Sequence, residues 1–296
     1  LDASDYRIDV NAKLGHDDDK SEFIANANET LARRYESFSN IIERDDWDLF
    51  FGVFMTTDRV NHFLFKHYTE DGTYHDEFIE FYQTVDEYIG ALREQLPDDV
   101  TMVIASDHGF TTLEYEVHCN AWLEEEGWLS YADEEHEELA DISDDTQAYS
   151  LIPGRFYLNL EGREPNGVVP ESEYESRRDE LKHALERLEG PDGTPVAERV
   201  VKQEEAFRGG HDDIAPDLVV IPNHGFDLKS GFGGGEDVFD TGPRNGMHSF
   251  DDATLYVDDP SVQIRDENLY DIAPTILDLM DIEYARAEFD GASLVQ

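Results

Sequence analysis

The chain has 296 residues, with 70 acidic against 22 basic side chains and a formal net charge of −48. A chain this negative has no basic patch with which to hold nucleic acid or an anionic membrane. No stretch approaches the ~18–20 apolar residues of a membrane span, and the single cysteine, Cys119, excludes an intrachain disulfide framework. The hydrophobic content of 39% argues against a disordered acidic tail, because apolar runs recur throughout.

The first third of the chain alternates helices and strands. Apolar residues at helical spacing predict amphipathic helices over residues 21–43 and 74–96. Continuous apolar runs predict strands buried on both faces over 48–54 and 102–105. This order predicts parallel strands with right-handed crossovers, and therefore an α/β fold in which the strand exits share one edge of the sheet.

Side chains suited to metal binding follow both predicted strands. Asp58 and His62 come after the first strand, four residues apart, so one turn of helix places them on the same face. Asp107 and His108 come directly after the second strand, before a glycine at which the backbone turns away. A carboxylate and an imidazole at the carboxyl end of a strand can hold one metal ion. The plainer alternative is that each Asp caps a helix or turn and each His is solvated.

The middle of the chain follows a different pattern. We expect a short helix over 120–126, an acidic loop over 132–147, a strand over 155–160 and a helix over 171–188. Because this stretch interrupts the α/β pattern, we expect residues 116–205 to form an inserted α+β subdomain. Residues 1–115 and 206–296 then form the core, which is incomplete at its N-terminus.

The last part of the chain returns to the first pattern. Strands are predicted over 216–222 and 253–257. His248 lies just before the second of these, where an isolated histidine is more often a surface residue. A final helix is predicted over 270–281, with Asp271 as its cap and Pro274 in its first turn.

Four segments taken together resemble the alkaline phosphatase superfamily, and within it the type I phosphodiesterase/nucleotide pyrophosphatase family. In chain order these segments read T-D-R-V-N-H, S-D-H-G-F, G-M-H-S-F and Y-D-I-A-P-T-I-L-D-L-M. The resemblance extends from about residue 45 to the end. It implies an alkaline-phosphatase-like, mostly parallel sheet flanked by helices.

The resemblance also implies two divalent metal ions, zinc or alternatively manganese. Asp58, His62 and His248 match the first metal site of the family, and Asp107 and His108 match two ligands of the second. In the family a further aspartate near the N-terminus completes the second site, and a threonine or serine nucleophile follows it. Three protein ligands leave an open position at a catalytic zinc.

The chain departs from the family pattern at its N-terminal side. Neither the strand with the further aspartate nor a nucleophile segment is found, and Thr56 and Thr57 lie too close to Asp58 to serve. The chain also opens on Leu1 rather than Met. We therefore expect an incomplete chain, with no catalytic nucleophile of its own and the nucleophile upstream.

Several other residues have two interpretations. His118 and Asn120 follow the Asp107–His108 pair and are candidates for substrate contacts. Arg155 and Arg244 have the planar guanidinium that binds phosphate, although pairing with the abundant carboxylates is the simpler interpretation. Cys119 is interpreted as a small packed residue.

The acid is spread over the whole chain, which in this respect resembles a haloarchaeal cytoplasmic protein. In molar salt, screening shortens the repulsion between charges to roughly 3 Å. The single cysteine fits a reducing compartment. We therefore expect a cytoplasmic protein of a high-salt cell.

The leading hypothesis is a two-metal phosphoric-ester hydrolase that acts on a small phosphate ester or nucleotide. The alternative is a non-catalytic, metal-stabilised module that binds such a ligand without converting it. Neither nucleic acid nor a membrane is expected as a partner. An upstream strand with an Asp and a Thr or Ser would favour the enzyme, whereas a native start just before Leu1 would favour the binding module.

Overall fold

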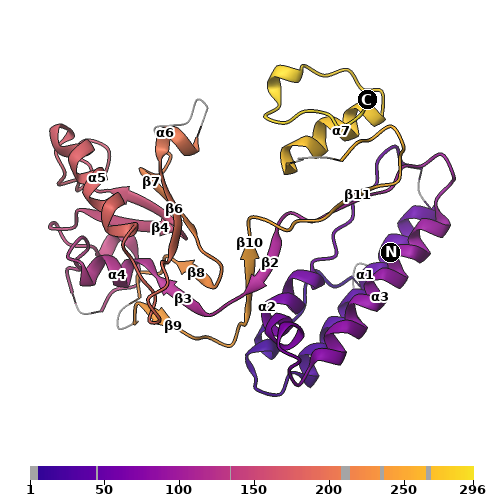
Figure 1. The fold of residues 1–296 in the computed structure, drawn as a ribbon, viewed down its shortest axis with the longest axis horizontal. Coiled ribbons are helices and arrows are strands. Elements are labelled where there is room, and N and C mark those ends of the chain that lie inside the picture. Colours follow the sequence, from indigo (N-terminus) through magenta and orange to yellow (C-terminus); the bar gives the residue numbers. More distant parts are fainter. Residues whose placement is uncertain (1–5, 45, 134, 208–213, 234–236, 265–267) are drawn as a thin grey trace. The chain divides into compact units, whose positions relative to one another are not determined.

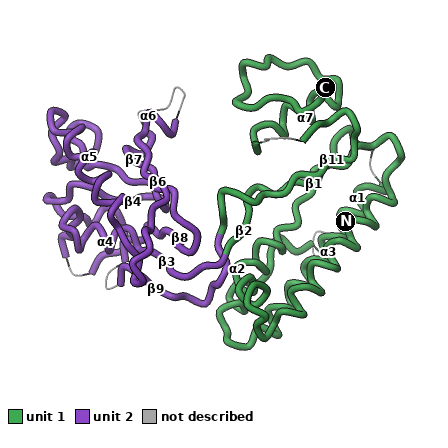
Figure 2. The backbone as a smooth tube through the Cα atoms, viewed as in Figure 1, with its two compact units in different colours: residues 1–111, 248–296 green, residues 112–247 purple. Residues whose placement is uncertain are grey.

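The computed structural model describes residues 6–44, 46–133, 135–207, 214–233, 237–264 and 268–296. The chain divides into two compact units (Figures 1 and 2). Unit 1 comprises residues 1–111 and 248–296, and unit 2 comprises residues 112–247. The chain crosses between them through β2 (Gly109–Thr112) and β10 (Gly246–Ser249), which pair with each other.

Unit 1 contains the helical part of the chain. Its other elements are η1 (Ala12–His16), α1 (Ser21–Arg44), α2 (Thr56–Thr69), α3 (His75–Gln95), β1 (Val103–Ala105), β11 (Leu255–Val257), η4 (Leu269–Asp271), α7 (Ile272–Leu279) and η5 (Arg286–Glu288).

Unit 2 contains most of the strands. Its elements are β3 (Tyr115–His118), α4 (Cys119–Glu125), η2 (Leu139–Asp141), β4 (Ala148–Ile152), β5 (Arg155–Leu158), η3 (Glu171–Glu173), α5 (Tyr174–Leu185), β6 (Ala197–Lys202), α6 (Gln203–Ala206), β7 (Leu218–Pro222), β8 (Phe226–Lys229) and β9 (Phe239–Asp240).

The core of unit 1 lies between α1, α2 and α3. Each helix contributes one apolar stripe at helical spacing, with Phe23 and Leu31 from α1, Phe63 from α2 and Phe78 from α3 fully or nearly buried. The helices predicted over 21–43 and 74–96 are therefore confirmed to within a residue at each end. The apolar stripes of these helices pack against one another within unit 1, and such packing supplies most of the stability of an amphipathic helix.

The strand predicted over 48–54 is absent from the described residues, and this prediction is wrong. The segment forms no strand pairing, and Phe50 and Phe54 are its partly buried residues. Phe50 and Phe54 pack edge-on against Phe38 of α1, with ring centroids 5.5 and 5.1 Å apart. Phe51, on the other face, is 79% exposed. An apolar run becomes a strand only where another strand offers its backbone groups, and none of the described strands does so here.

The predicted parallel sheet is not confirmed. The apolar run over 102–105 forms the three-residue β1, which pairs antiparallel with β11 and remains only partly buried. The molecule mixes helices and strands, as an α/β fold does, but its sheets are small and mostly antiparallel. Strands β3 and β8 run parallel to each other.

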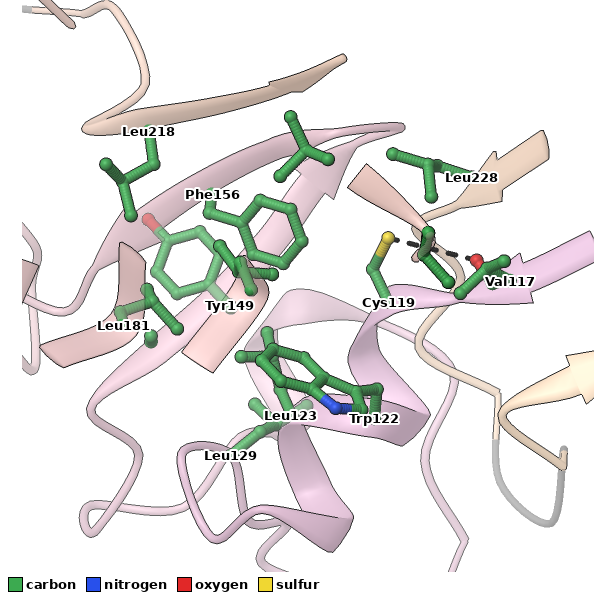
Figure 3. Packing of buried hydrophobic residues seen from close by; sticks show 14 of the residues in the cluster. Val117, Cys119, Trp122, Leu123, Leu129, Tyr149, Phe156, Leu181, Leu218 and Leu228 are labelled. Carbon is green, nitrogen blue, oxygen red and sulfur yellow. Dashed lines mark hydrogen bonds between the residues drawn. The ribbon is translucent and has the colours of Figure 1, made fainter. Parts of the chain in front are cut away.

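The largest sheet lies in unit 2, with strand order β4-β5-β7-β6 and antiparallel pairing throughout. Helices α4 and α5 contribute Trp122, Leu123 and Leu181 to the apolar core that this sheet helps to build (Figure 3). Cys119 lies within that core and is 3% exposed, with its Sγ 3.8 Å from the Val117 carbonyl oxygen (Figure 3). Cys119 is thus the small packed residue that the sequence predicts.

A buried carboxylate, Asp217, ties unit 2 together just before β7. It is fully buried and accepts two hydrogen bonds from Arg163, at 2.7 and 2.8 Å, and one from the Leu158 backbone nitrogen at 2.7 Å. The Tyr174 hydroxyl donates a fourth at 2.6 Å. Burial raises the pKa of Tyr174, so its hydroxyl stays protonated and continues to donate. A buried charge is tolerated because its lone pairs are all used.

The end of the chain forms η4 and α7 where the final helix is predicted. Asp271 does act as a capping residue, but at a different position from the predicted one. Its carboxylate accepts the Asn268 backbone nitrogen at 2.8 Å and the Ala292 backbone nitrogen at 2.7 Å, and no side-chain cap of α7 itself is formed. It therefore joins the helix start to the C-terminal segment.

The boundaries of the two compact units differ from the domain boundaries that the sequence predicts. Unit 2 runs from 112 to 247, whereas the expected insert ends at 205. Strands β7 and β8 belong to the sheets of unit 2, because β7 pairs with β5 and β6, and β8 pairs with β3. The assignment of 116–205 as an insert remains a prediction about domain organisation.

Among the described helices, none combines the length and the apolar character needed to cross a membrane.

We predict that Asp217→Asn lowers the free energy of unfolding by about 3 kcal/mol, because Arg163 loses its buried counter-ion. The measurement is chemical denaturation in molar KCl. Asp144→Asn, at an exposed position, serves as the control and should change the free energy by less than ~0.5 kcal/mol. Equal effects of the two substitutions would contradict a special role of Asp217.

We predict that the Cys119 thiol of the folded protein does not react with an aromatic disulfide reagent at pH 8. Burial raises the pKa of Cys119 to about 11, and the thiolate is the reactive form. The measurement is the visible absorbance of the aromatic thiolate that the reagent releases, recorded with and without denaturant. Stoichiometric reaction within seconds in the absence of denaturant would show that the thiol is not buried.

Candidate metal centre

The first two candidate ligands lie at the start of α2. Asp58 is in the first turn and His62 follows one turn later, so the Asp58 Oδ1 and His62 Nε2 atoms lie 3.5 Å apart. The His62 side chain is nearly buried, whereas Asp58 is partly open. The i, i+4 spacing therefore brings both side chains to one face, as predicted.

The second pair is held in place by the end of β1. Ser106 extends the pairing of β1 with β11 by two hydrogen bonds to Thr254. Its backbone nitrogen donates to the Thr254 carbonyl at 2.9 Å, and its hydroxyl accepts the Thr254 backbone nitrogen at 2.8 Å. Asp107 and His108 follow at once. Gly109 then passes so near the Asp251 carbonyl oxygen that a Cβ there would lie 1.9 Å from it. Only glycine fits this approach.

His248, on β10, completes the cluster. Its Nε2 lies 2.9 Å from Asp58 Oδ1. Its ring stacks on that of His108, with centroids 3.8 Å apart and planes 29° apart, and lies 4.8 Å from the ring of His62. The pairing of β2 with β10 brings residues from the two distant ends of unit 1 together.

Three side chains form a group that could hold a metal ion. One ligand atom from each of Asp58, His108 and His248 lies within 4.8 Å of the other two. His108 Nδ1 is 3.1 Å from the Gly109 carbonyl oxygen, which can only accept, so in that contact Nδ1 carries the hydrogen. In the neutral ring, Nε2 then presents a lone pair toward Asp58 Oδ1 at 4.0 Å and Asp107 Oδ1 at 3.4 Å.

This arrangement fits a cation. Lone pairs of an imidazole and of two carboxylates that face one another repel unless a proton or a metal ion lies between them. Imidazole and carboxylate are also the donors that zinc and manganese accept. The contact of His108 Nδ1 with a backbone carbonyl is the usual way in which a metal-binding histidine is oriented.

All five predicted ligands belong to unit 1, and the three imidazoles among them surround one carboxylate oxygen, Asp58 Oδ1. Asp107 is 80% exposed, and its Oδ1 lies 3.4 Å from His108 Nε2. The tight group contains His108 rather than His62, whereas the family pattern assigns His62 to the site of Asp58 and His248. The division of the five into two sites remains a prediction.

The electrostatics of Asp58 follow from these neighbours. Burial by itself would raise the pKa of Asp58, but the hydrogen bond with His248 and the charges of His62, His248 and Arg59 hold it below its ordinary value. The carboxylate is therefore ionised at neutral pH, as a metal ligand must be.

Two further residues of the site carried no predicted role. Phe110, directly after Gly109, places its ring against all three imidazoles, with centroids 5.1 Å from His62, 5.8 Å from His108 and 5.3 Å from His248. It fills the space behind the ligands and restricts their rotation. The sequence shows an apolar residue at this position but cannot show what it packs against. Arg59, which follows Asp58 in the chain, is the second residue of the site for which the sequence predicted no role.

The predicted substrate contacts lie in unit 2. Asn120 is 1% exposed, and its amide donates to the carbonyls of Ser150, Ser230 and Gly231 at 2.9–3.2 Å while its oxygen accepts the Ser150 nitrogen at 2.8 Å. These core hydrogen bonds do not favour the substrate contact suggested for Asn120, which remains a prediction. His118, at the end of β3, is partly buried, and its suggested substrate contact remains a prediction.

The two candidate arginines have protein partners. Arg244 pairs with Glu116 and Asp227, and Arg155 donates to the Pro153 carbonyl at 3.1 Å. Burial by itself would raise the pKa of Asp227, but the nearby Lys229 and Arg244 hold it below its ordinary value. The pairing of Arg244 with carboxylates is the simpler of the two interpretations, and the contacts favour it.

Unit 2 also contains a cavity of about 1280 Å³, which does not suit an anionic substrate. Its walls are mostly acidic, with Glu124, Asp133, Glu135, Glu137, Glu138 and Asp141 among the lining residues. Such a field repels a phosphate ester. This cavity is therefore a weaker candidate site than the imidazole cluster.

We predict that Gly109→Ala weakens metal binding and lowers the free energy of unfolding by about 1–3 kcal/mol, because the backbone beside His108 must move away from Asp251. Gly90→Ala is the control. Gly90 lies within α3 with open space around it, so the same change should stabilise by roughly 0.5–1 kcal/mol. Thermal unfolding of both variants distinguishes the two effects, and equal shifts would contradict the close approach at Gly109.

Comparison with known proteins assigns the family. The family model described as type I phosphodiesterase / nucleotide pyrophosphatase matches residues 2–251, well over half of the chain. No curated protein and no solved structure matches the chain. The matched range includes Asp58, His62, Asp107, His108 and His248. The chain belongs to the type I phosphodiesterase/nucleotide pyrophosphatase family, within the alkaline phosphatase superfamily.

Proposed function

We propose that this chain carries the metal centre of a phosphoric-ester hydrolase that acts on a small phosphodiester or nucleotide. The observation that carries the proposal is the convergence of His62, His108 and His248 on one carboxylate oxygen of Asp58. Family membership supports the reaction class, since the matching family is one of phosphodiesterases and nucleotide pyrophosphatases.

The roles of the ligands follow the family pattern. Asp58, His62 and His248 hold one divalent ion, and Asp107 and His108 contribute to a second. Zinc fits the mixed imidazole and carboxylate donors, and manganese is the alternative. When bound, the two ions supply the positive charge that stabilises the attacking and leaving oxygens of a phosphoryl transfer.

The remaining parts of the site prepare this geometry. Asp58 stays ionised because of its neighbours, and the contact of His108 with the Gly109 carbonyl turns Nε2 toward the carboxylates. Phe110 packs against the three imidazole rings and limits their freedom. Ligands held in this way need little reorganisation on binding, which is the general source of a well-defined catalytic centre.

We further infer that the nucleophile is not among the hydroxyls beside the cluster. The Thr57 hydroxyl donates to the Phe54 carbonyl at 2.9 Å, the Ser249 hydroxyl donates to the Asp251 carbonyl at 2.8 Å, and the Ser106 hydroxyl accepts the Thr254 nitrogen. Thr56 is 1% exposed and inaccessible to a substrate. These contacts argue against these four hydroxyls as the nucleophile and are consistent with the expectation that it lies elsewhere. They equally favour the second candidate, a metal-stabilised module that binds a phosphate ester without converting it.

The solvent in which the protein works is part of the proposal. A net charge of −48 is tolerated where salt screens it, so we infer a high-salt cytoplasm. Activity and metal affinity are therefore to be measured in molar KCl.

The test combines a metal count with hydrolysis of bis-p-nitrophenyl phosphate in molar KCl, with zinc or manganese added. We predict bound metal, and a loss of metal affinity of more than ~100-fold in His62→Ala and in His108→Ala, since each removes a ligand. His183→Ala, at an exposed position on α5, is the matched control and should leave the affinity unchanged.

Turnover separates the two candidates. Hydrolysis that disappears in His108→Ala would support the enzyme and would mean either that a nucleophile exists within this chain or that water attacks the phosphorus directly. Bound metal without turnover would support the binding module or an enzyme whose nucleophile lies elsewhere. A wild-type chain that binds neither zinc nor manganese would overturn the proposal.

A further inference from the structure

We propose that Arg59 is a positioning residue that fixes the orientation of the Asp58 carboxylate, and that Asp9 holds Arg59 in place. The inference rests on the proposed metal centre. It assigns a function to two residues outside the ligand set, one of them 49 positions before Asp58 in the chain.

The contacts connect the three residues in series. Arg59 Nη1 lies 3.4 Å from Asp58 Oδ2. On its other edge, Arg59 donates from Nε and Nη2 to a single oxygen, Asp9 Oδ2, at 3.0 and 2.8 Å. The second oxygen of Asp9 accepts the Val10 backbone nitrogen at 2.8 Å, so Asp9 is itself fixed to the backbone.

These contacts divide the two oxygens of Asp58 between two tasks. Oδ1 faces the imidazoles, at 2.9 Å from His248 and 3.5 Å from His62. Oδ2 faces the guanidinium. Rotation of a carboxylate about its last torsion is soft, and without a cation beside Oδ2 nothing in these contacts selects which oxygen is presented. Arg59 therefore favours binding of a metal ion through Oδ1 alone.

Asp9 explains how a permanent cation can lie beside a site for divalent ions. Arginine stays charged at every physiological pH, and an uncompensated guanidinium would repel the metal ion. The carboxylate of Asp9 cancels that charge, and it occupies the Nε/Nη2 edge that would otherwise bind a phosphate in a bidentate manner. The pair thus acts on Asp58 rather than on the substrate.

The competing explanation is an ordinary surface ion pair. The side chains of Arg59 and Asp9 are 33% and 30% exposed, and pairs of this kind contribute little to stability. The two explanations differ in what they predict. An ordinary ion pair affects unfolding slightly and metal binding not at all, whereas a positioning residue affects metal binding even when unfolding of the metal-free chain is unchanged.

The experiment titrates Co²⁺ into the full chain in molar KCl and records both the dissociation constant and the visible absorption of the bound ion. The variants are Arg59→Gln, Arg59→Lys and Asp9→Asn. Arg93→Gln is the matched control, because Arg93 belongs to the same unit and pairs at 2.7 Å with Asp258, which is not one of the proposed ligands. Thermal unfolding of each metal-free variant is measured in parallel.

We expect Arg59→Gln to weaken Co²⁺ binding by about 10–100-fold, the usual effect of losing a group that orients a ligand. The absorption should change as well, because Asp58 is free to bind through either or both oxygens. Arg59→Lys should recover part of the affinity, since it keeps the charge but lacks the planar fork. Asp9→Asn should shift affinity in the same direction by less, and Arg93→Gln should match the wild type.

Equal Co²⁺ affinity and spectrum in Arg59→Gln and in the wild type would overturn the inference and leave the metal centre intact. Loss of affinity that follows the melting temperature across all variants, Arg93→Gln included, would also overturn it. If Arg59→Gln does not fold, Arg59→Lys and Asp9→Asn decide the question by the same criteria. A wild type that binds no Co²⁺, Zn²⁺ or Mn²⁺ would instead overturn the proposed function itself.

Discussion

The site depends on one carboxylate oxygen, Asp58 Oδ1, on which three imidazoles converge. His248 lies on β10, and His108 directly precedes β2, the strand that pairs with β10. His62 lies on α2, the same helix as Asp58. So many lone pairs in so small a space require a positive charge among them. The chemistry of unit 1 follows from that requirement, since the ligands, Phe110 behind them and Arg59 beside them all serve to keep the oxygen ionised and oriented.

Basic residues are scarce in this chain, and many of the described ones are engaged with carboxylates. Arg163 serves the buried Asp217, Arg178 joins Glu175 to Glu204, and Arg244 joins Glu116 to Asp227. At low salt these pairs lie within a strongly repulsive field, and in molar salt that field is screened while partly buried pairs persist. The excess acid and the pairing of these arginines with specific carboxylates are therefore compatible in a high-salt solvent.

Local patterns predicted the helices well, and they located the strands expected over 155–160, 216–222 and 253–257 as β5, β7 and β11, but they did not predict how strands pair. The stripes of α1 and α3 contain the information for the helix within one segment, since the hydrogen bonds of a helix are local. The apolar runs at 48–54 and 102–105 carry the same strength of pattern, yet one stays unpaired and the other forms the short antiparallel β1. A strand obtains its hydrogen bonds from another strand, and the identity, direction and presence of that partner are not written in the run itself.

For the site, the sequence by itself determined which side chains could bind a metal and that Asp58 and His62 share a helix face, because spacing within one turn is a local property. It did not determine that Asp58 Oδ1 is shared, that Phe110 packs against three imidazoles, or that Asp9 reaches Asp58 through Arg59. It also favoured a substrate contact for Asn120, which the fold uses for core hydrogen bonds. These features join residues far apart in the chain, and only the tertiary structure decides which distant groups meet.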